Sequence, residues 1–147
     1  MTRTSIFRIV LVALLSVSTF IGIGASEAQA AGGKRIVVDL SQQMLYAYSG
    51  NALVFSMSVN ARGTRTGNFR VQNRIALAGS IYRGWQLPYW LGIYYVGRIQ
   101  NGIHGPEVLR GGRTATTSLG CVVIRSRASA ARLFAWAPVG TLVTVRR

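Results

Sequence analysis

The sequence contains one histidine and one cysteine, His104 and Cys121, which lie 17 positions apart. A thiolate attacks carbonyl carbons, and a neighbouring imidazole can lower the thiol pKa and then carry the proton. Gly105 follows the histidine and Gly120 precedes the cysteine, and glycine lets backbone amides approach an oxyanion closely. These residues predict an acyl-transfer site. The same residues also fit a structural histidine and a small buried cysteine beside Val122.

The rest of the composition excludes several other kinds of site. A single cysteine cannot form an intramolecular disulfide bond, and one histidine, one cysteine and three carboxylates are a poor ligand set for a metal ion. So few carboxylates also argue against catalysis by a carboxylate pair. The chain has 147 residues, half of them hydrophobic, which is enough for one packed domain and too short for two. We therefore expect one domain without a metal site.

The first 30 residues have the pattern of a targeting segment. Two arginines precede an apolar run over residues 9–23, and Ala28-Gln29-Ala30 provides a small-residue cleavage pattern. The apolar run is about 15 residues long, whereas a helix that spans a bilayer needs about 20. The pattern predicts a secretory signal peptide over residues 1–30 rather than a membrane anchor. The mature domain, residues 31–147, is then exported to the periplasm or cell wall without a membrane span.

The mature chain is strongly basic. Removing the signal peptide takes away two of the 17 basic and one of the three acidic residues, which leaves 15 and 2 and a net charge of +13. All of the remaining basic residues except Lys34 are arginines, which bind carboxylates and phosphates in a bidentate way. This charge suggests an anionic cell-wall polymer as a partner, or arginines that only solvate the surface. Export argues against a nucleic-acid partner.

Short apolar or alternating runs between turn residues predict a mostly antiparallel β protein. The expected strands cover residues 34–40, 43–48, 52–59, 69–77, 92–96, 98–104, 119–124 and 140–145. Residues 79–91 are rich in aromatic side chains and are expected to be irregular, and residues 106–117 are expected to form a loop. A short helix is expected over residues 127–137, with Ser126 as its N-cap and Pro138 as its stop.

The first part of the mature chain predicts a β-hairpin. Residues 43–48 and 52–59 flank the turn cluster Ser49-Gly50-Asn51. Alternation places four apolar side chains of the second strand on one face. They are Leu53, Phe55, Met57 and Val59.

The segments around the histidine and cysteine resemble the L,D-transpeptidase catalytic domain, the YkuD family. That family has His-Gly or His-Ser, a loop, and then Ser/Thr-His-Gly-Cys, and this chain has His104-Gly105, a loop and Ser118-Leu119-Gly120-Cys121. Three further segments resemble the family's opening hairpin, Thr-Pro-x-Gly-x-Phe segment and closing strand. They are residues 35–48, 63–70 and 140–145, so the resemblance covers about residues 34–146.

The resemblance implies a fold and a chemistry. The fold is mainly β, a YkuD-like β-sandwich with one short helix after the strand of the catalytic cysteine. Cys121 is the nucleophile, and His104 is the general base and acid, oriented by the Gly105 backbone carbonyl. The Gly120 amide, with that of Cys121, holds the oxyanion. The substrate is a peptidoglycan stem peptide that loses D-Ala and leaves a thioester, and no cofactor is involved.

The resemblance also implies substrate-binding positions. Ser118 and Leu119 stand in the motif before the cysteine, and in most members the position of Leu119 is a second histidine that shapes the donor pocket. Arg125 is expected to replace the usual Arg or Asn two residues after the cysteine, where this chain has Val123. Arg113, with its neighbour Arg110, is expected to bind stem carboxylates, unless both are only solvent-exposed.

The aromatic loop from Tyr82 to Trp90 matches the place of a flap in that family. Trp85 and Tyr89 are its candidate substrate contacts, and the alternative is a small satellite core. The two mature carboxylates are given smaller roles. Asp39 is expected to pair with an arginine, and Glu107 to pair with a loop arginine or to tune His104.

Two other functions compete with the transpeptidase. The departures at Leu119 and Val123 fit a catalytically weak or inactive wall-binding module of the same fold. The charge alone fits a secreted basic protein that binds anionic polymer. Within the enzyme hypothesis, the thioester acceptor is a second stem peptide, water or a protein lysine, and the sequence does not choose among them.

Overall fold

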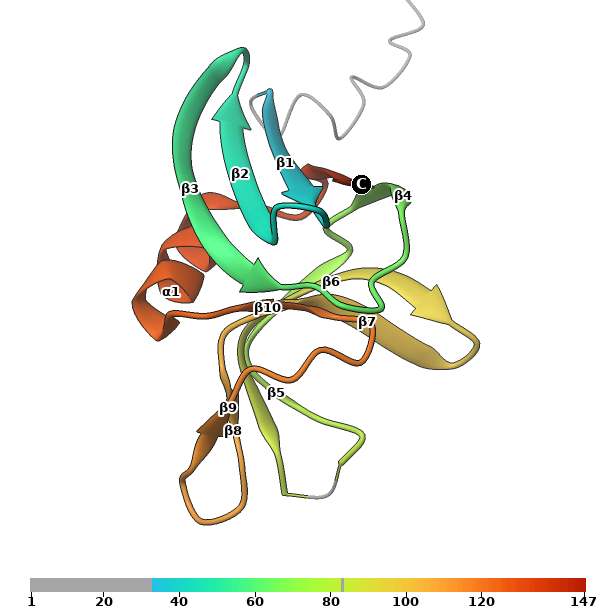
Figure 1. The fold of residues 1–147 in the computed structure, drawn as a ribbon, viewed down its shortest axis with the longest axis vertical. Coiled ribbons are helices and arrows are strands. Elements are labelled where there is room, and N and C mark those ends of the chain that lie inside the picture. Colours follow the sequence, from blue (N-terminus) through green and yellow to red (C-terminus); the bar gives the residue numbers. More distant parts are fainter. Residues whose placement is uncertain (1–32, 83) are drawn as a thin grey trace, which may run out of the picture.

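The computed structural model describes residues 33–82 and 84–147 (Figure 1). The predicted signal peptide over residues 1–30 lies outside these residues. The described part is mainly strands with a single helix, which follows the strand after Cys121, as predicted. In chain order, the elements are β1 (Lys34–Asp39), β2 (Met44–Ser49), β3 (Ala52–Asn60), β4 (Gly67–Arg70), β5 (Asn73–Gly79), β6 (Gln86–Val96), β7 (Ile99–His104), β8 (Glu107–Val108), β9 (Thr114–Ala115), β10 (Val122–Ile124), α1 (Arg127–Trp136) and β11 (Leu142–Arg146).

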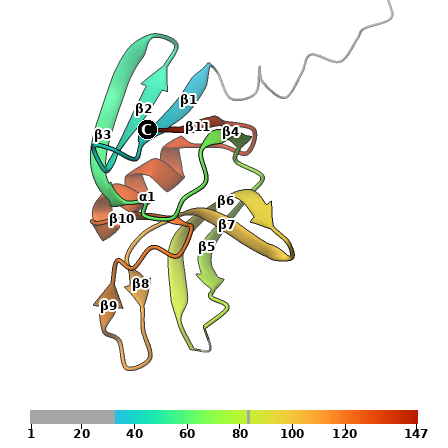
Figure 2. The same ribbon diagram turned by 45° about the vertical axis from the view of Figure 1, so that its right-hand side comes forward.

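The strands form one continuous path that folds into two halves. Its order is β4-β11-β1-β2-β3 in the first half and β10-β7-β6-β8-β9 in the second, with β5 paired to β6. The nine-residue strand β3 joins the halves, because its beginning pairs with β2 and its end pairs with β10. The β8–β9 hairpin and the end of the β5–β6 hairpin extend from the second half on the same side (Figures 1 and 2).

The sheet is mostly antiparallel, as predicted, but two of its strand pairings are parallel. Strand β11 runs parallel to β1, and β10 runs parallel to β7. Parallel neighbours need a long connection, and both pairs are formed by strands far apart in the sequence. The run of strands along the sequence therefore did not reveal these two pairings.

The expected strand over residues 69–77 is two strands, β4 and β5. Between them, the Val71 N–H donates to the Thr141 carbonyl and the Gln72 N–H donates to the Gly92 carbonyl. The chain therefore changes partner from β11 to β6 within two residues. This exchange depends on tertiary pairing and leaves no local signal.

The prediction that residues 79–91 are irregular is wrong for their second half, which begins β6. This strand has 11 residues and pairs with β5, β7 and β8. Pro88 lies within it, and its carbonyl still accepts a hydrogen bond from the Gly105 N–H. Pairing along most of β6 thus outweighs the local preference of proline for a turn.

The first hairpin forms as predicted, with one difference on its inner face. Phe55, Met57 and Val59 are buried, but Leu53 is 52% exposed. A β-bulge is the cause, because Tyr48 pairs with Leu53 and Ala47 pairs with Phe55, which skips one residue of β3. Each side chain before the bulge therefore points to the opposite face.

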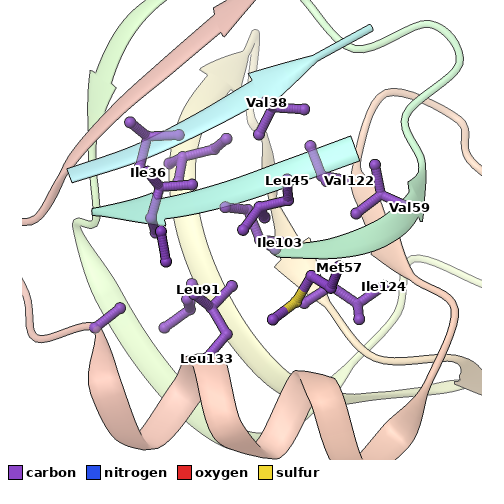
Figure 3. Packing of buried hydrophobic residues seen from close by; sticks show 14 of the residues in the cluster. Ile36, Val38, Leu45, Met57, Val59, Leu91, Ile103, Val122, Ile124 and Leu133 are labelled. Carbon is purple, nitrogen blue, oxygen red and sulfur yellow. The ribbon is translucent and has the colours of Figure 1, made fainter. Parts of the chain in front are cut away.

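The helix α1 closes the core. The Ser126 hydroxyl caps it by accepting from the Ser129 N–H, as predicted, and the helix ends at Trp136, one residue early. Cations from other elements bind its last carbonyls, since Lys34 Nζ donates to Trp136 and Arg74 donates to Phe134. Leu133 packs into the core with side chains from both halves of the sheet (Figure 3).

The strands that carry the histidine and cysteine are among the most buried parts of the molecule. Ile103 on β7 and Val122 and Val123 on β10 have no exposed surface, and Ile124 has 1%. Such packing restricts movement of the backbone around the site. No helix in the described part is long and apolar enough to cross a membrane.

Candidate active site

Two neighbouring parallel strands bring His104 and Cys121 together. His104 is the last residue of β7, and Cys121 directly precedes β10. The register pairs Val122 with Ile103 and Val123 with His104. Both candidate residues line one pocket of about 340 Å³. The structure therefore places the two candidate residues at the same cavity.

The surroundings of His104 fix its proton. The side chain is 2% exposed, and its Nδ1 lies 2.7 Å from the Gly105 carbonyl oxygen. A carbonyl can only accept, so Nδ1 carries the hydrogen and Nε2 keeps a free lone pair. Burial lowers the pKa of His104 to about 4, although the Gly105 carbonyl partly opposes this. At neutral pH the ring is therefore uncharged, with Nε2 able to accept a proton.

The Cys121 thiol is protonated in the resting protein. Its Sγ lies 3.7 Å from Asn101 Oδ1. Burial raises the thiol pKa, a hydrogen bond from the Gly102 backbone opposes this, and the nearby Glu107 carboxyl raises it further. We expected His104 to lower this pKa, and that expectation is wrong for the free protein because a neutral imidazole offers no charge. The resting pocket therefore holds a neutral thiol and a neutral imidazole.

The turn before Cys121 is held by hydrogen bonds to its carbonyls. Tyr94 donates its hydroxyl to the Gly120 carbonyl at 2.6 Å, and Thr64 donates its hydroxyl to the Cys121 carbonyl at 2.9 Å. The Ser118 hydroxyl lies 2.5 Å from the Arg62 carbonyl and 2.6 Å from that of Cys121. These contacts fix the backbone without using its N–H groups.

Gly120 is required at its position. Its φ is +115°, and a Cβ there would lie 2.7 Å from Asn101 Oδ1. Any other residue would be strained and would also displace Asn101. The close approach of Gly120 to Asn101 in turn sets where Cys121 begins its strand.

Two other buried polar residues line the pocket, and the sequence analysis named Glu107 but not Asn101. Asn101 on β7 is 7% exposed and contacts the thiol, and Glu107 on β8 is 4% exposed and lines the same pocket. Burial raises the Glu107 pKa, while N–H groups of Thr117 and of Glu107 itself lower it. Glu107 Oε2 has no hydrogen-bond partner in the described part of the chain. Strand β7 contains three polar residues, Gln100, Asn101 and His104, so the sequence carried no signal that singled out Asn101.

The two carboxylates among the described residues, Asp39 and Glu107, have different outcomes. Asp39 pairs with Arg146 at 3.7 Å, as expected for a structural ion pair. Glu107 has no such partner among residues 33–82 and 84–147, so the expected pairing with a loop arginine is not observed there. The Glu107 carboxyl instead acts on Cys121, because its charge raises the pKa of the thiol.

The predicted substrate-binding residues divide into two groups. Leu119 and Trp85 line the pocket, and Trp85 packs against Tyr82 at 5.0 Å between ring centroids. The pocket lining does not include Ser118, Tyr89, Arg113 and Arg125.

The second group lies elsewhere for identifiable reasons. Tyr89 packs on Phe134 beside the main core, which is closer to the satellite-core alternative than to a flap. Arg113 and Arg125 are exposed, and the Arg125 N–H donates to Ser58 of β3. An arginine that does line the pocket is Arg98, from the turn between β6 and β7.

The described residues offer no metal centre. Within residues 33–82 and 84–147, no three His, Cys, Asp or Glu side chains lie close enough together to hold an ion. The chemical groups at the pocket include a thiol, an imidazole, amides, a carboxyl and the guanidinium of Arg98. This set is suited to covalent attack on a carbonyl carbon with proton transfer.

We compared the chain with models of known protein families, with curated proteins and with solved structures. Residues 33–145 match the YkuD family, described as the L,D-transpeptidase catalytic domain. A search of curated proteins finds no match.

Several solved structures share the fold. An L,D-transpeptidase (Yku) from Stackebrandtia nassauensis has a TM-score of 0.64 and 22% identity, covering 78% of this chain and 56% of its own. An L,D-transpeptidase from Mycobacterium smegmatis has a TM-score of 0.62 and 15% identity, and the match covers 78% of this chain and 59% of that one. An L,D-transpeptidase from Xylanimonas cellulosilytica has a TM-score of 0.60 and 22% identity, and the match covers 78% of this chain and 61% of that one. This chain thus spans less than two thirds of each, and identities this low show a shared fold alone.

Proposed function

The chain belongs to the YkuD family of L,D-transpeptidase catalytic domains, and we propose that it is an exported cysteine transpeptidase acting on peptidoglycan tetrapeptide stems. The single observation that carries this proposal is that one pocket is lined both by Cys121 and by His104, whose Nδ1 is held by the Gly105 carbonyl so that Nε2 can accept a proton. The predicted signal peptide and the net charge of +13 support the location, because an anionic wall polymer would retain a basic protein.

The acylation step uses the neutral pair directly. Cys121 Sγ attacks the carbonyl that precedes D-Ala, while His104 Nε2 takes the thiol proton, so that a C–S bond forms and a tetrahedral oxyanion develops. The imidazolium then gives that proton to the leaving amine, the C–N bond breaks, and D-Ala departs. The Gly105 carbonyl stabilises the charged ring through Nδ1–H.

The oxyanion is assigned to the N–H groups of Gly120 and Cys121. The Gly120 carbonyl is directed toward Tyr94, and in a trans peptide the following N–H points the opposite way. The Cys121 N–H therefore points away from Tyr94. A donor fixed in advance in this way stabilises charge without rearranging during the reaction.

The thioester has three possible fates. An amine of a second stem yields a cross-link, water yields a shortened stem, and a protein lysine yields an anchored protein. An enzyme that uses the stem amine is a transpeptidase, and one that uses water is an L,D-carboxypeptidase. All three release D-Ala and regenerate the thiol, and they differ only in the nucleophile.

The test is a mass-spectrometric assay with disaccharide-tetrapeptide as substrate. The purified protein should release D-Ala, and Cys121→Ala should not. A cross-linked dimer identifies the transpeptidase, and a tripeptide without dimer identifies the carboxypeptidase.

One feature favours a second candidate, a binding module of low activity. Leu119 and the fully buried Val123 leave the motif without its usual polar side chains. Absence of D-Ala release, with binding to the intact wall retained, would support this module instead of the enzyme.

A further inference from the structure

Several exposed apolar side chains line the pocket that contains Cys121. Leu119 is 66% exposed and Ile81 is 69% exposed, and both line the pocket that contains the thiol. Three other exposed hydrophobic residues line it as well. We call this set the apolar collar, and its members are Ile75, Ile81, Tyr82, Ile99 and Leu119.

The apolar collar gathers exposed hydrophobic side chains, which cost free energy to leave in water, at one pocket. The described residues include 11 exposed large hydrophobic side chains, and five of them belong to this one pocket. They come from three separate segments, namely β5 with its following turn, the start of β7, and the turn before Cys121. Convergence from distant segments onto one cavity marks a binding surface rather than a chance run of sequence.

The position of Leu119 is fixed by its two neighbours. Ser118 is held by the carbonyls of Arg62 and Cys121, and the Gly120 carbonyl is held by Tyr94. The backbone on both sides of Leu119 is therefore tied to the protein. Its side chain is exposed because the fold holds it there, two residues before the nucleophile.

We propose that the apolar collar, through Leu119, makes the Cys121 thioester react with an amine carried on an aliphatic chain in preference to water. The inference rests on the proposed function and selects one of its three outcomes, aminolysis. Methylene groups of the amine pack on the collar and displace water from the acyl group. A water molecule gains nothing from these side chains.

The step balances without any further reactant. The amine nitrogen bonds to the thioester carbonyl carbon, the C–S bond breaks, and the electron pair stays on sulfur. The proton that the nitrogen loses passes through His104 to the thiolate, which restores the thiol. Hydrolysis follows the same course with oxygen in place of nitrogen, so the ratio of the two products reports the selectivity of the pocket.

The first test compares products from disaccharide-tetrapeptide. Leu119→Asn keeps the size of the side chain and removes its apolar character, Leu119→Met keeps the character, and Leu53→Asn is a matched exposed leucine outside the pocket. We expect Leu119→Asn to raise the ratio of hydrolysed to cross-linked product by at least about fivefold. The other two variants should stay within about twofold of the wild type.

The second test varies the amine. Wild-type protein with tetrapeptide donor receives either n-butylamine or 2-methoxyethylamine, and each rate is divided by the rate of the same amine with a small thioester in solution. The normalised preference should favour n-butylamine, and Leu119→Asn should remove most of that preference.

The outcomes separate this inference from the proposed function. An unchanged product ratio in Leu119→Asn, with D-Ala still released, would overturn the role of the apolar collar and leave the enzyme intact. Equal normalised rates for the two amines would do the same. No D-Ala release by the wild type would overturn both.

Discussion

The resting state of the Cys121–His104 pair can be tested by the pH dependence of thiol alkylation. Cys121 is the only cysteine in the chain, so iodoacetamide labels one site. Its pKa is raised by burial, and the neutral His104 supplies no charge that would lower it. The free protein should therefore contain less thiolate than an ordinary cysteine.

The size of the effect follows from the ordinary thiol pKa of about 8.5. A pKa above this value leaves less than about 3% thiolate at pH 7. Because alkylation consumes the thiolate, its rate should rise about tenfold for each pH unit from 6 to 8. No plateau should appear at acid pH.

The assay measures the alkylation rate by mass spectrometry from pH 5 to 10, for wild type and His104→Ala. The two rates should agree within about twofold near pH 7, since the resting pair contains no ion pair. Release of D-Ala should instead fall by about 10²–10⁴ in His104→Ala, because the proton carrier is lost.

One result would refute this reasoning. A rate plateau below pH 7 that disappears in His104→Ala would show a thiolate–imidazolium pair in the free protein. The neutral pair deduced from the burial of His104 and from the Gly105 hydrogen bond would then be incorrect.

Four further outcomes are expected. Because the pKa of buried His104 is about 4 and the ordinary value is 6.5, the unfolded chain binds the proton first as pH falls, so stability should fall by up to about 3 kcal/mol between pH 6.5 and 4. The raised Glu107 pKa acts in the opposite direction and reduces this loss of stability. Urea denaturation at several pH values measures the free energy of unfolding, and His104→Asn should make it depend less on pH. Gly120→Ala should lose about 3 kcal/mol, because it is strained at φ +115° and crowds Asn101; Gly79→Ala, whose Cβ meets nothing within 4 Å, is the matched control. Glu107→Gln should increase the alkylation rate at pH 7.5 about two- to threefold, because a negative charge near the thiol is removed, whereas Asp39→Asn should leave it unchanged. Binding to an anionic polymer such as polyphosphate should weaken steeply between about 50 and about 500 mM salt, because salt screens charges over this range. Binding that persists at high salt would contradict binding by charge.

Local patterns predicted the parts of the fold that are stabilised locally. The hairpin of β2 and β3 follows from alternation around a Gly-Asn turn, and α1 follows from the Ser126 cap and the periodic apolar residues. Both need only neighbours in the sequence. The pattern therefore located them to within about two residues.

Elements that depend on distant partners were not predictable in the same way. The chain leaves β11 for β6 at Val71 and Gln72, and nothing in these two residues announces the change. The first part of β6, residues 86–91, was interpreted as irregular because of its proline and aromatic residues, yet three partner strands order β6. Tertiary pairing decided both.

The candidate site was predictable where residue type alone was informative. His104 and Cys121 are unique in the chain, and the structure places both at one pocket. Arg113 and Arg125 were chosen by nearness in sequence, but only folding of the hairpins decides which arginine lines the pocket, and Arg98 does so. The burial of Glu107 was invisible for the same reason.

The parallel pairing of β7 with β10 has a consequence for how this fold can evolve. The 16 residues between His104 and Cys121 include the β8–β9 hairpin, whose tip contains Gly111 and Gly112 with open space around them. Doubling the length of such a loop costs only about 0.6 kcal/mol, so insertions at the tip need not disturb the strands that flank it. The hairpin can therefore change in length while the two buried strands β7 and β10 keep His104 and Cys121 in place.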